Sequence, residues 1–364
     1  MSLWRYKLKA LIVTIRDNAF NYGNKLQNFA VKKILERYNY KVETLCFERA
    51  KKNDTLRYAK YLFHKCTNYI FAKRKEYWLE YAVFRKFDSK NIPAVYIQNP
   101  NDIKGYDLYV IGSDQVWNAK WYHYKPIRKE FYLLNFDKQV KKLCMAPSFG
   151  INELPKEWVS WFKDMLPTFT HISVREEKGA EIVKKLTGQD ATVMVDPTML
   201  LTQDEWKQIA KKPRNINVSN GYILTYFLGG TNQQVESDLK AISEKHNLKI
   251  FNLMDENSPE LCEIGPSEFI YMISNASLIM TDSFHASVFS FLFEKPFLVY
   301  PRSGAEDDML SRLFTLINKF GLEDRFVETE IPKDIFACNY KMGYEKLEIE
   351  RNKAREFIEM SLKD

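Results

Sequence analysis

The residues best suited to chemistry follow an apolar stretch in the second half of the chain. There, SLIM is followed by TDSFHAS at 281–287. Thr281, Asp282 or Ser283 can cap a following helix, which places His285 in its first turn. The positive potential at a helix N-terminus attracts anions and lowers the pKa of a histidine. His285 is therefore a candidate general acid or base near neutral pH, and a structural histidine is the competing interpretation.

Two further polar groups follow apolar stretches in the first half. Arg175 comes directly after THISV, and an arginine at the mouth of a cleft suits bidentate binding of a carboxylate or phosphate. A solvated salt bridge is the competing interpretation. The sequence GSDQVWN follows DLYVI and carries Ser113, Asp114 and Gln115. These residues either bind a ligand or belong to a capped helix with a buried tryptophan.

A polar turn follows the first apolar stretch. The sequence RDNAFNYGNKLQN contains Asn21, Gly23, Asn24 and Gln27. A glycine-containing turn at a helix start can present free N–H groups to an anion, and an N-capped turn without a ligand is the alternative. The chain lacks both G-x-G-x-x-G and G-x-x-x-x-G-K-[ST]. Neither a Rossmann dinucleotide fingerprint nor a P-loop is therefore supported.

The elements that carry these residues alternate short apolar stretches with helical periodicity, a pattern typical of α/β proteins with mostly parallel sheets. The expected strands are 8–15, 41–47, 107–112, 141–146, 170–175, 192–196, 221–228, 248–253, 277–280 and 296–300. The clearest expected helices are 176–186, 233–246, 266–274 and one that starts near residue 285. Open parallel sheets bind ligands beyond the carboxyl ends of their strands, which is where the polar groups fall. We therefore expect two Rossmann-like domains with a cleft between them.

Length and composition agree with two globular domains. The 364 residues are too many for one core, and 45% hydrophobic with 28% charged residues excludes a fibre or a disordered chain. We expect an N-terminal domain at 1–198, a C-terminal domain at 199–340, and a terminal helix at 341–364 that packs back on the N-terminal domain. No apolar run approaches the ~20 residues of a membrane span. The five cysteines, odd in number and without a CxxC pair, favour a reducing, cytoplasmic location.

The net charge of +7 is concentrated in an aromatic segment at about 49–90, which holds twelve Lys and Arg against four Asp and Glu. We interpret this segment as a helical insert of the N-terminal domain. It either covers a sheet face with lysines on its outer side or makes a peripheral contact with an anionic membrane surface. Basic and aromatic residues also suit single-stranded nucleic acid, but nothing else in the sequence supports such a partner, and none is expected.

Motifs along the chain resemble those of one enzyme family. They are NYGNKLQ (21–27), YDLYVIGSDQVWN (106–118), ISVREEKG (172–179), VDPTMLL (195–201), the run from GPSEF to EKPF (265–297) and GLEDR (321–325). GSDQVWN and TDSFHAS in this order are the most specific. From about residue 10 to residue 330 the chain resembles the polysaccharide pyruvyl transferase family.

The resemblance implies a GT-B-like pair of Rossmann-like domains and a transferase. Members of the family move a pyruvate unit from phosphoenolpyruvate (PEP) to two hydroxyls of a sugar, which gives a cyclic ketal. The family's important arginine and histidine fall on Arg175 and His285. His285 is then the expected proton donor and Arg175 the group that holds the anionic donor across the cleft. PEP acts as donor substrate, and no metal or other cofactor is expected.

The resemblance also implies substrate-binding residues and an acceptor. Thr281, Ser283 and the helix start are expected to cradle phosphate. The other expected substrate-binding residues are Asn21, Gly23, Gln27, Ser113, Asp114 and Gln115. The implied acceptor is a sugar of a surface polysaccharide or of its precursor, and lipid-linked precursors belong to this class. A lipid-linked acceptor would agree with a peripheral position at the inner membrane face.

One departure from the family pattern concerns the donor site. Some members have an arginine two residues before the histidine, where this chain has Ser283. A second cation must then come from elsewhere, and Arg302, Arg312 and Lys295 are the candidates. Two alternative functions stay open at this point. One is a nucleotide-sugar glycosyltransferase on the same architecture, and the other is a non-catalytic protein that binds a sugar or an anion.

Overall fold

The computed structural model describes residues 8–15, 20–47, 72–97, 99–124, 128–136, 139–218, 221–255, 258, 260–303 and 311–363. Contacts group the chain into two units. Unit 1 comprises Met1–Ala59, Asp88–Leu201 and Ile349–Asp364, and unit 2 comprises Lys60–Phe87 and Thr202–Glu348. The domains expected at 1–198 and 199–340, and the expected packing of the terminal helix, stay predictions, because contacts group residues without showing which segments fold independently.

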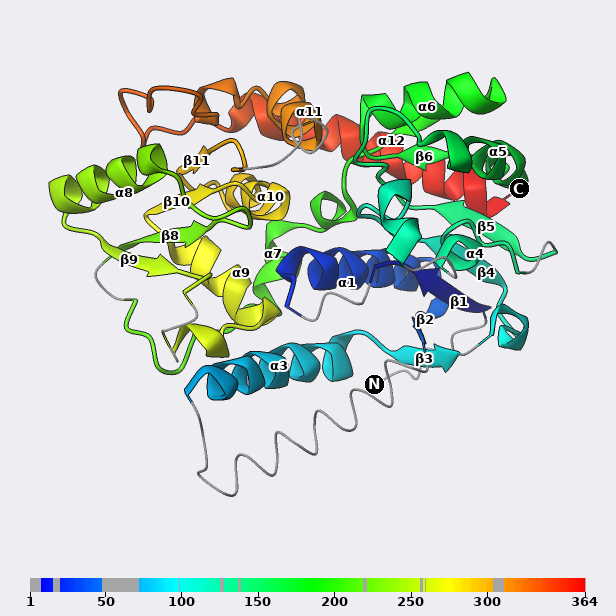
Figure 1. Ribbon diagram of the computed structural model, residues 1–364, viewed down its shortest axis with the longest axis horizontal. Helices are drawn as coiled ribbons and strands as arrows, with labels where there is room; N and C mark the ends of the chain where they lie inside the picture. Colours follow the sequence, from blue (N-terminus) through cyan, green and yellow to red (C-terminus); the bar gives the residue numbers. More distant parts are fainter. Residues whose placement is uncertain are drawn as a thin grey trace. The chain divides into compact units, whose positions relative to one another are not determined.

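Unit 1 is built on a parallel five-stranded sheet in the order β3-β2-β1-β4-β5 (Figure 1). Its strands are β1 (Leu8–Val13), β2 (Tyr40–Phe47), β3 (Ala94–Ile97), β4 (Leu108–Ile111) and β5 (Lys141–Cys144). β6 (Ser173–Val174) and β7 (Thr192–Val193) form a separate, short parallel pair. The strand order reverses between β1 and β4, so the carboxyl ends of these two strands form the topological switch point at which such sheets bind ligands.

Helices join the strands of unit 1. They are α1 (Tyr22–Arg37), α4 (Arg128–Tyr132), α5 (Lys156–Met165) and α6 (Glu177–Thr187). The α5 and α6 helices are amphipathic and bury Phe162 and Val183 in one core with Trp117. The α6 helix ends at Gly188, whose φ of 74° belongs to the left-handed region that glycine adopts without strain.

Unit 2 contains a parallel four-stranded sheet in the order β11-β10-β8-β9 (Figure 1). Its strands are β8 (Tyr222–Tyr226), β9 (Lys249–Asn252), β10 (Leu278–Thr281) and β11 (Phe297–Val299). Its helices are α7 (Gln203–Lys207), α8 (Gln233–His246), α9 (Pro266–Asn275), α10 (Phe284–Leu292) and α11 (Ser311–Phe320). The chain closes with α12 (Lys341–Lys363), whose residues from Ile349 onward group with unit 1. Two parallel sheets with helical connections confirm the predicted α/β class.

The basic aromatic insert predicted at about 49–90 is described only in part. Residues 48–71 lie outside the described residues, whereas α3 (Ala72–Asn91) is helical. Near its end, Phe84 and Phe87 are buried while Lys86 and Lys90 are exposed. This pattern is typical of a helix that covers a core and turns its lysines outward.

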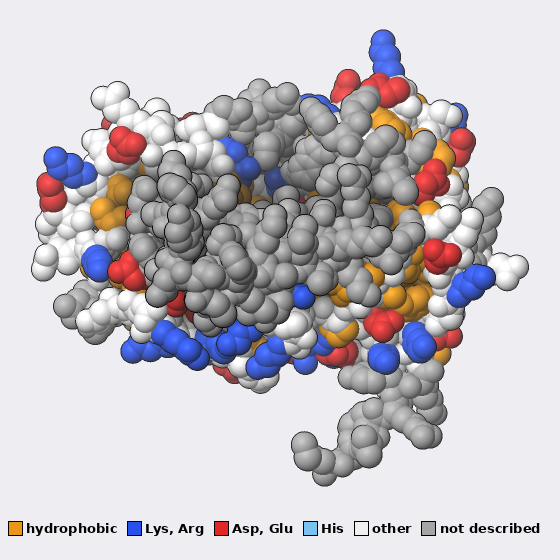
Figure 2. Space-filling model, turned by 60° about the horizontal axis from the view of Figure 1, so that its bottom comes forward, with side chains coloured by type: hydrophobic (Ala, Val, Ile, Leu, Met, Phe, Trp, Pro, Cys, Tyr) orange, Lys and Arg blue, Asp and Glu red, His pale blue; other side chains and the backbone are white. Residues whose placement is uncertain are grey.

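On the face drawn in Figure 2, Lys and Arg side chains lie along the lower margin with Asp and Glu among them. Among the described residues, no helix is both long and apolar enough to cross a membrane.

Candidate functional site

Polar side chains meet at the switch point of the unit 1 sheet, just past the ends of β1 and β4. Thr14 Oγ1 donates to the carbonyl of Ser113 at 3.0 Å and accepts from Gln27 Nε2 at 2.8 Å. Ser113 Oγ lies 2.8 Å from Asp196 Oδ2 and 2.9 Å from the carbonyl oxygen of Ala146. The structure therefore joins Gln27 and Ser113, two residues predicted from different motifs, in one buried network.

Arg175 lies in the same network and is held by carboxylates. Its Nη1 donates to Asp196 Oδ2 at 2.7 Å, and its Nη2 lies 3.6 Å from Asp114 Oδ1. The side chains of Arg175 and Asp196 are 2% and 0% exposed. Burial disfavours the charged guanidinium, but Asp196, Asp114 and Glu176 outweigh it, and the pKa of Arg175 is raised. Arg175 is thus a charged, paired residue rather than a solvated one, and its predicted contact with the donor stays a prediction.

Glu176 is a site residue that the sequence interpretation missed. Its Oε1 accepts hydrogen bonds from Ser148 Oγ at 3.0 Å, Phe149 N at 2.8 Å and Gly150 N at 3.1 Å. The carboxylate therefore shapes the loop that follows β5 and brings it against Gln115, because a Cβ on Gly150 would lie 2.5 Å from Gln115 Nε2. The sequence did show an acidic residue directly after Arg175, but only the folded structure shows that the loop after β5 lies against Glu176.

The backbone at these strand ends is strained. Asp114 has a φ of 76° and Ala146 a φ of 52°, both in the left-handed region that residues with a Cβ rarely adopt. Asp114 also pairs with Pro147 through an isolated parallel bridge. Strain of this kind costs about 1–3 kcal/mol per residue and gathers at functional sites, where the surrounding structure maintains it. Asp114 and Ala146 lie in the loops after β4 and β5, the same loops that carry the predicted residues of unit 1.

The polar turn before α1 serves as a helix cap. Asn21 is the N-cap of α1, and its Oδ1 accepts from Asn24 N at 3.0 Å. Gly23 lies in the first turn of α1 and is buried. Asn24 Nδ2 donates to Asp114 Oδ2, which ties the start of α1 to the strand ends. The structure therefore shows the N-cap, and whether Asn21 and Gly23 also contact a ligand stays a prediction.

In unit 2 the predicted residues gather at the start of α10. Ser283 is the N-cap, and its hydroxyl accepts from Ala286 N at 3.4 Å. Thr281 Oγ1 accepts from Ser283 N at 3.0 Å and lies 2.6 Å from the carbonyl oxygen of Tyr226. His285 occupies the first turn of α10, as expected, with its ring perpendicular to that of Phe284 at a centroid distance of 5.2 Å. The structure thus brings Thr281, Ser283 and His285 together at the carboxyl end of β10.

Among the three candidate cations, Arg302 lies at this edge and Lys295 does not. Arg302 follows β11, and its Nε donates to Asp282 Oδ2 at 3.1 Å. Lys295 precedes β11, so it lies at the amino end of the strand. There, burial and the nearby Lys207 lower the pKa of Lys295. Arg312 lies in α11. Arg302 is therefore the candidate next to the residues that precede His285.

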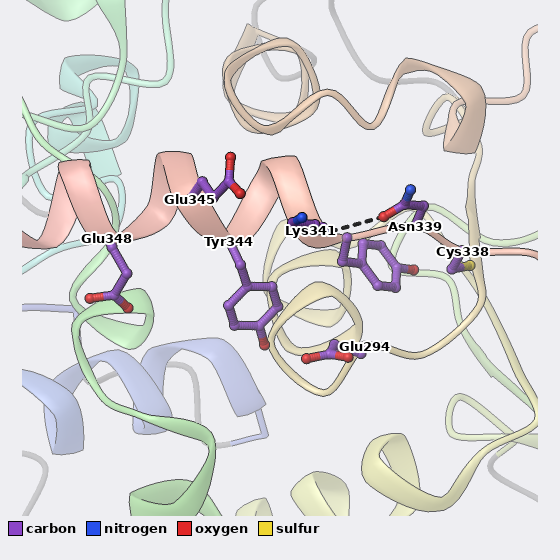
Figure 3. Close-up of a pocket in the computed structure, with 8 residues that line it drawn as sticks. Glu294, Cys338, Asn339, Lys341, Tyr344, Glu345 and Glu348 are labelled. Atoms are coloured by element: carbon purple, nitrogen blue, oxygen red, sulfur yellow. Dashed lines mark hydrogen bonds between the residues drawn. The ribbon is translucent and has the colours of Figure 1, made fainter.

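A pocket in unit 2 lies elsewhere and has a different character. It has a volume of about 560 Å³ and is lined by Glu294, Cys338, Asn339, Tyr340, Lys341, Tyr344, Glu345 and Glu348 (Figure 3). Tyr344 and Glu348 point to the same side of α12. None of the predicted site residues lines it, and its three glutamates disfavour an anionic ligand.

Metal ligands do not gather in the described part of the chain, where no group of three or more His, Cys, Asp and Glu could hold an ion. The expectation that no metal or other cofactor is needed is not tested by this finding and stays a prediction.

The comparisons with known proteins bear on the family of the chain. The family model described as polysaccharide pyruvyl transferase matches residues 21–304, which is more than half of the chain and includes both groups of strand-end residues. The chain belongs to the polysaccharide pyruvyl transferase family. Membership confirms the resemblance in the motifs and implies that the chain is a transferase. No curated protein matches the chain.

Solved structures give weaker similarities. UDP-GlcNAc 2-epimerase from Methanocaldococcus jannaschii is 13% identical, with 94% of this chain and 92% of that chain covered and a TM-score of 0.46. UDP-GlcNAc 2-epimerase from Neisseria meningitidis, bound to UDP-GlcNAc, is 13% identical, with 98% and 100% covered and a TM-score of 0.44. E. coli heptosyltransferase WaaC with ADP is 10% identical, with 97% and 100% covered and a TM-score of 0.38. At these scores the similarities carry no functional argument.

Proposed function

We propose that this protein transfers a pyruvate unit from PEP to a sugar of a surface polysaccharide or of its precursor. The observation that carries the proposal is the position of His285 in the first turn of α10, within the stretch matched by the family. A helix start offers positive potential and free N–H groups to a phosphate, and a histidine there is placed to move a proton. Ser283 lies at the same helix start and is the proposed phosphate contact. The Thr281 hydroxyl donates to the carbonyl of Tyr226 and accepts from Ser283 N, so its proposed part is to position this helix start.

His285 is the proposed proton donor. It protonates the methylene carbon of PEP, which gives a methyl group and an oxocarbenium-like carbon. One sugar hydroxyl attacks this carbon, and its proton returns to the imidazole. The bond to phosphate then breaks, and a second hydroxyl closes the ketal, with its proton leaving on the phosphate. PEP and a diol thus yield a ketal and inorganic phosphate.

The polar network of unit 1 supports a role in binding hydroxyl groups. One guanidinium, Arg175, faces the carboxyl groups of Asp114, Asp196 and Glu176, so the network has no excess of positive charge. The buried atoms of this network without a hydrogen-bond partner among the described residues include Asn24 Oδ1, Gln27 Oε1, Gln115 Nε2 and Glu176 Oε2. Three of these are acceptors. Since sugar hydroxyls donate hydrogen bonds, the network suits an acceptor sugar better than a second anion.

We also propose that Arg175 lies beside the donor. Its raised pKa keeps the guanidinium charged, and we propose that the transferred unit passes beside it. A peripheral contact with the inner membrane face through residues 49–90 remains part of the proposal, since a lipid-linked acceptor would be met there.

The test is to incubate the protein with PEP and candidate sugars and to measure phosphate release together with the mass gain of the ketal on the acceptor. Phosphate release that depends on the acceptor, with a matching ketal product, supports the proposal. Inactivity with PEP combined with turnover of a nucleotide-sugar would identify a glycosyltransferase instead. Binding of a sugar or an anion without any product would identify a non-catalytic member.

A further inference from the structure

The donor of the proposed reaction carries a carboxylate and a phosphate, and the two cations that the family motif supplies are not both present. Ser283 stands where some members of the family have an arginine. The remaining arginine of the motif, Arg175, is already paired with Asp196 at 2.7 Å and lies 3.6 Å from Asp114. A multiply charged anion therefore needs a further fixed cation, and the strand ends of unit 2 contain one.

Arg302 is fixed at these strand ends by Asp282. Its Nε lies 3.1 Å from Asp282 Oδ2, and its Nη2 lies 3.3 Å from the carbonyl oxygen of the same residue. The Asp282 carboxylate is shared, because it also accepts from Leu228 N at 2.7 Å and Gly229 N at 2.8 Å. Asp282 thus ties together the loops after β8, β10 and β11 and holds the guanidinium in place. A planar guanidinium held on one edge can still bind an anion with its remaining donors.

Two comparisons distinguish Arg302 from Arg175. The side chain of Arg302 is 18% exposed, against 2% for Arg175, so a ligand can reach it. Arg302 faces one carboxylate that two backbone N–H groups share, whereas Arg175 faces three acidic residues. Among the described residues, Nη1 of Arg302 makes no hydrogen bond. Arg302 therefore has a single carboxylate partner among the described residues, and its Nη1 keeps donors for a ligand.

Gly229 makes room for this arrangement. A Cβ at Gly229 would lie 2.4 Å from Arg302 Cγ and 3.0 Å from the carbonyl oxygen of Ser303. Both distances are shorter than van der Waals contact, so any larger residue would displace the arginine stem. The glycine is needed here for the close approach of a side chain rather than for a turn.

We propose that Arg302 is the second cation of the donor site and binds a phosphate or carboxylate group beside the start of α10. Asp282 directly precedes the N-cap Ser283, and the guanidinium that it holds therefore lies next to the segment that carries His285. The inference rests on the proposed function for the identity of the donor, PEP. The anion site itself is inferred only from the contacts within unit 2.

The experiment compares the full-length protein with Arg302→Gln, Arg302→Lys and Lys295→Gln. Lys295→Gln removes the same charge from the opposite end of β11 and is the matched control. Loss of one charge-assisted contact predicts that Arg302→Gln raises the KM for PEP about 10- to 100-fold, with a much smaller change in the KM for the acceptor. Arg302→Lys should recover part of the affinity, and Lys295→Gln should match the wild type. Gly229→Ala, which changes no charge, should weaken PEP binding by displacing the arginine.

Direct titration of the wild type and the variants with PEP and with inorganic phosphate separates this inference from the proposed function. If the wild type does not bind PEP but binds phosphate in an Arg302-dependent manner, the proposed function fails and the anion site stands. If Arg302→Gln and Gly229→Ala both bind PEP and phosphate as tightly as the wild type, the inference is overturned. A wild type that binds neither anion would overturn both.

Discussion

Replacing Arg175 by methionine tests whether this residue holds the strand ends of unit 1 together. Arg175 and Asp196 are both almost completely buried, with Nη1 and Oδ2 at 2.7 Å. Removing one partner of a buried pair costs about 3–5 kcal/mol, because the other charge is left without compensation. Asp196 would still accept from Thr198 N at 3.0 Å and Thr198 Oγ1 at 2.7 Å. We therefore expect a loss near the lower limit, about 3 kcal/mol.

The double variant Arg175→Met with Asp196→Asn shows whether the loss comes from the uncompensated charge. Because the second substitution removes that charge, the double variant should be more stable than Arg175→Met alone. The interaction free energy from the cycle should reach at least ~1 kcal/mol. Lys178→Met provides the control, since Lys178 pairs with Glu181 on the surface and its loss should change stability little.

Hydrogen exchange of backbone amides is the suitable assay, because the two units need not unfold together. Amides of β4 and β5 should lose protection in Arg175→Met, while those of β8 and β10 should keep it. Unchanged protection in unit 1 together with a loss of transferase activity would contradict a structural role of Arg175. Arg175 would then act on the substrate alone, without a role in stability.

Three further predictions concern other parts of the molecule. His285→Ala should lower kcat about 10²- to 10⁴-fold with folding intact by circular dichroism, and wild-type activity would show that the histidine is not the proton donor. Cys144 is buried, and burial raises the pKa of its thiol to about 12, so it should resist thiol reagents at pH 8 until the protein is unfolded. This thiol ionises near pH 9 in the unfolded chain but not in the folded chain. Its ionisation should therefore lower the free energy of unfolding as the pH rises from about 9 toward 12, which urea titrations can measure. Anionic liposomes should sediment the protein at low salt and release it at high salt, and no binding at low salt would exclude the proposed membrane contact.

Much of the fold could be predicted from the sequence because the signals are local. The apolar stretch at 107–112 contains β4, and the stretch at 277–280 overlaps β10. The three capping candidates Thr281, Asp282 and Ser283 predicted that His285 lies in the first turn of the next helix, and the structure confirms this position, with Ser283 as the cap. The motifs likewise identified the family. Strand length, apolar periodicity and helix caps depend on neighbouring residues, so they can be recognised without the rest of the structure.

The contacts within each group of site residues were decided only by the tertiary structure. The sequence could not choose among Arg302, Arg312 and Lys295, nor could it foresee that Glu176 would hold the loop after β5. The pairs concerned are separated along the chain by 20 or more residues, as between Arg302 and Asp282 or between Arg175 and Asp196. They meet because parallel strands in a particular order bring their carboxyl ends to one edge, and strand order is a property of the whole sheet rather than of any segment.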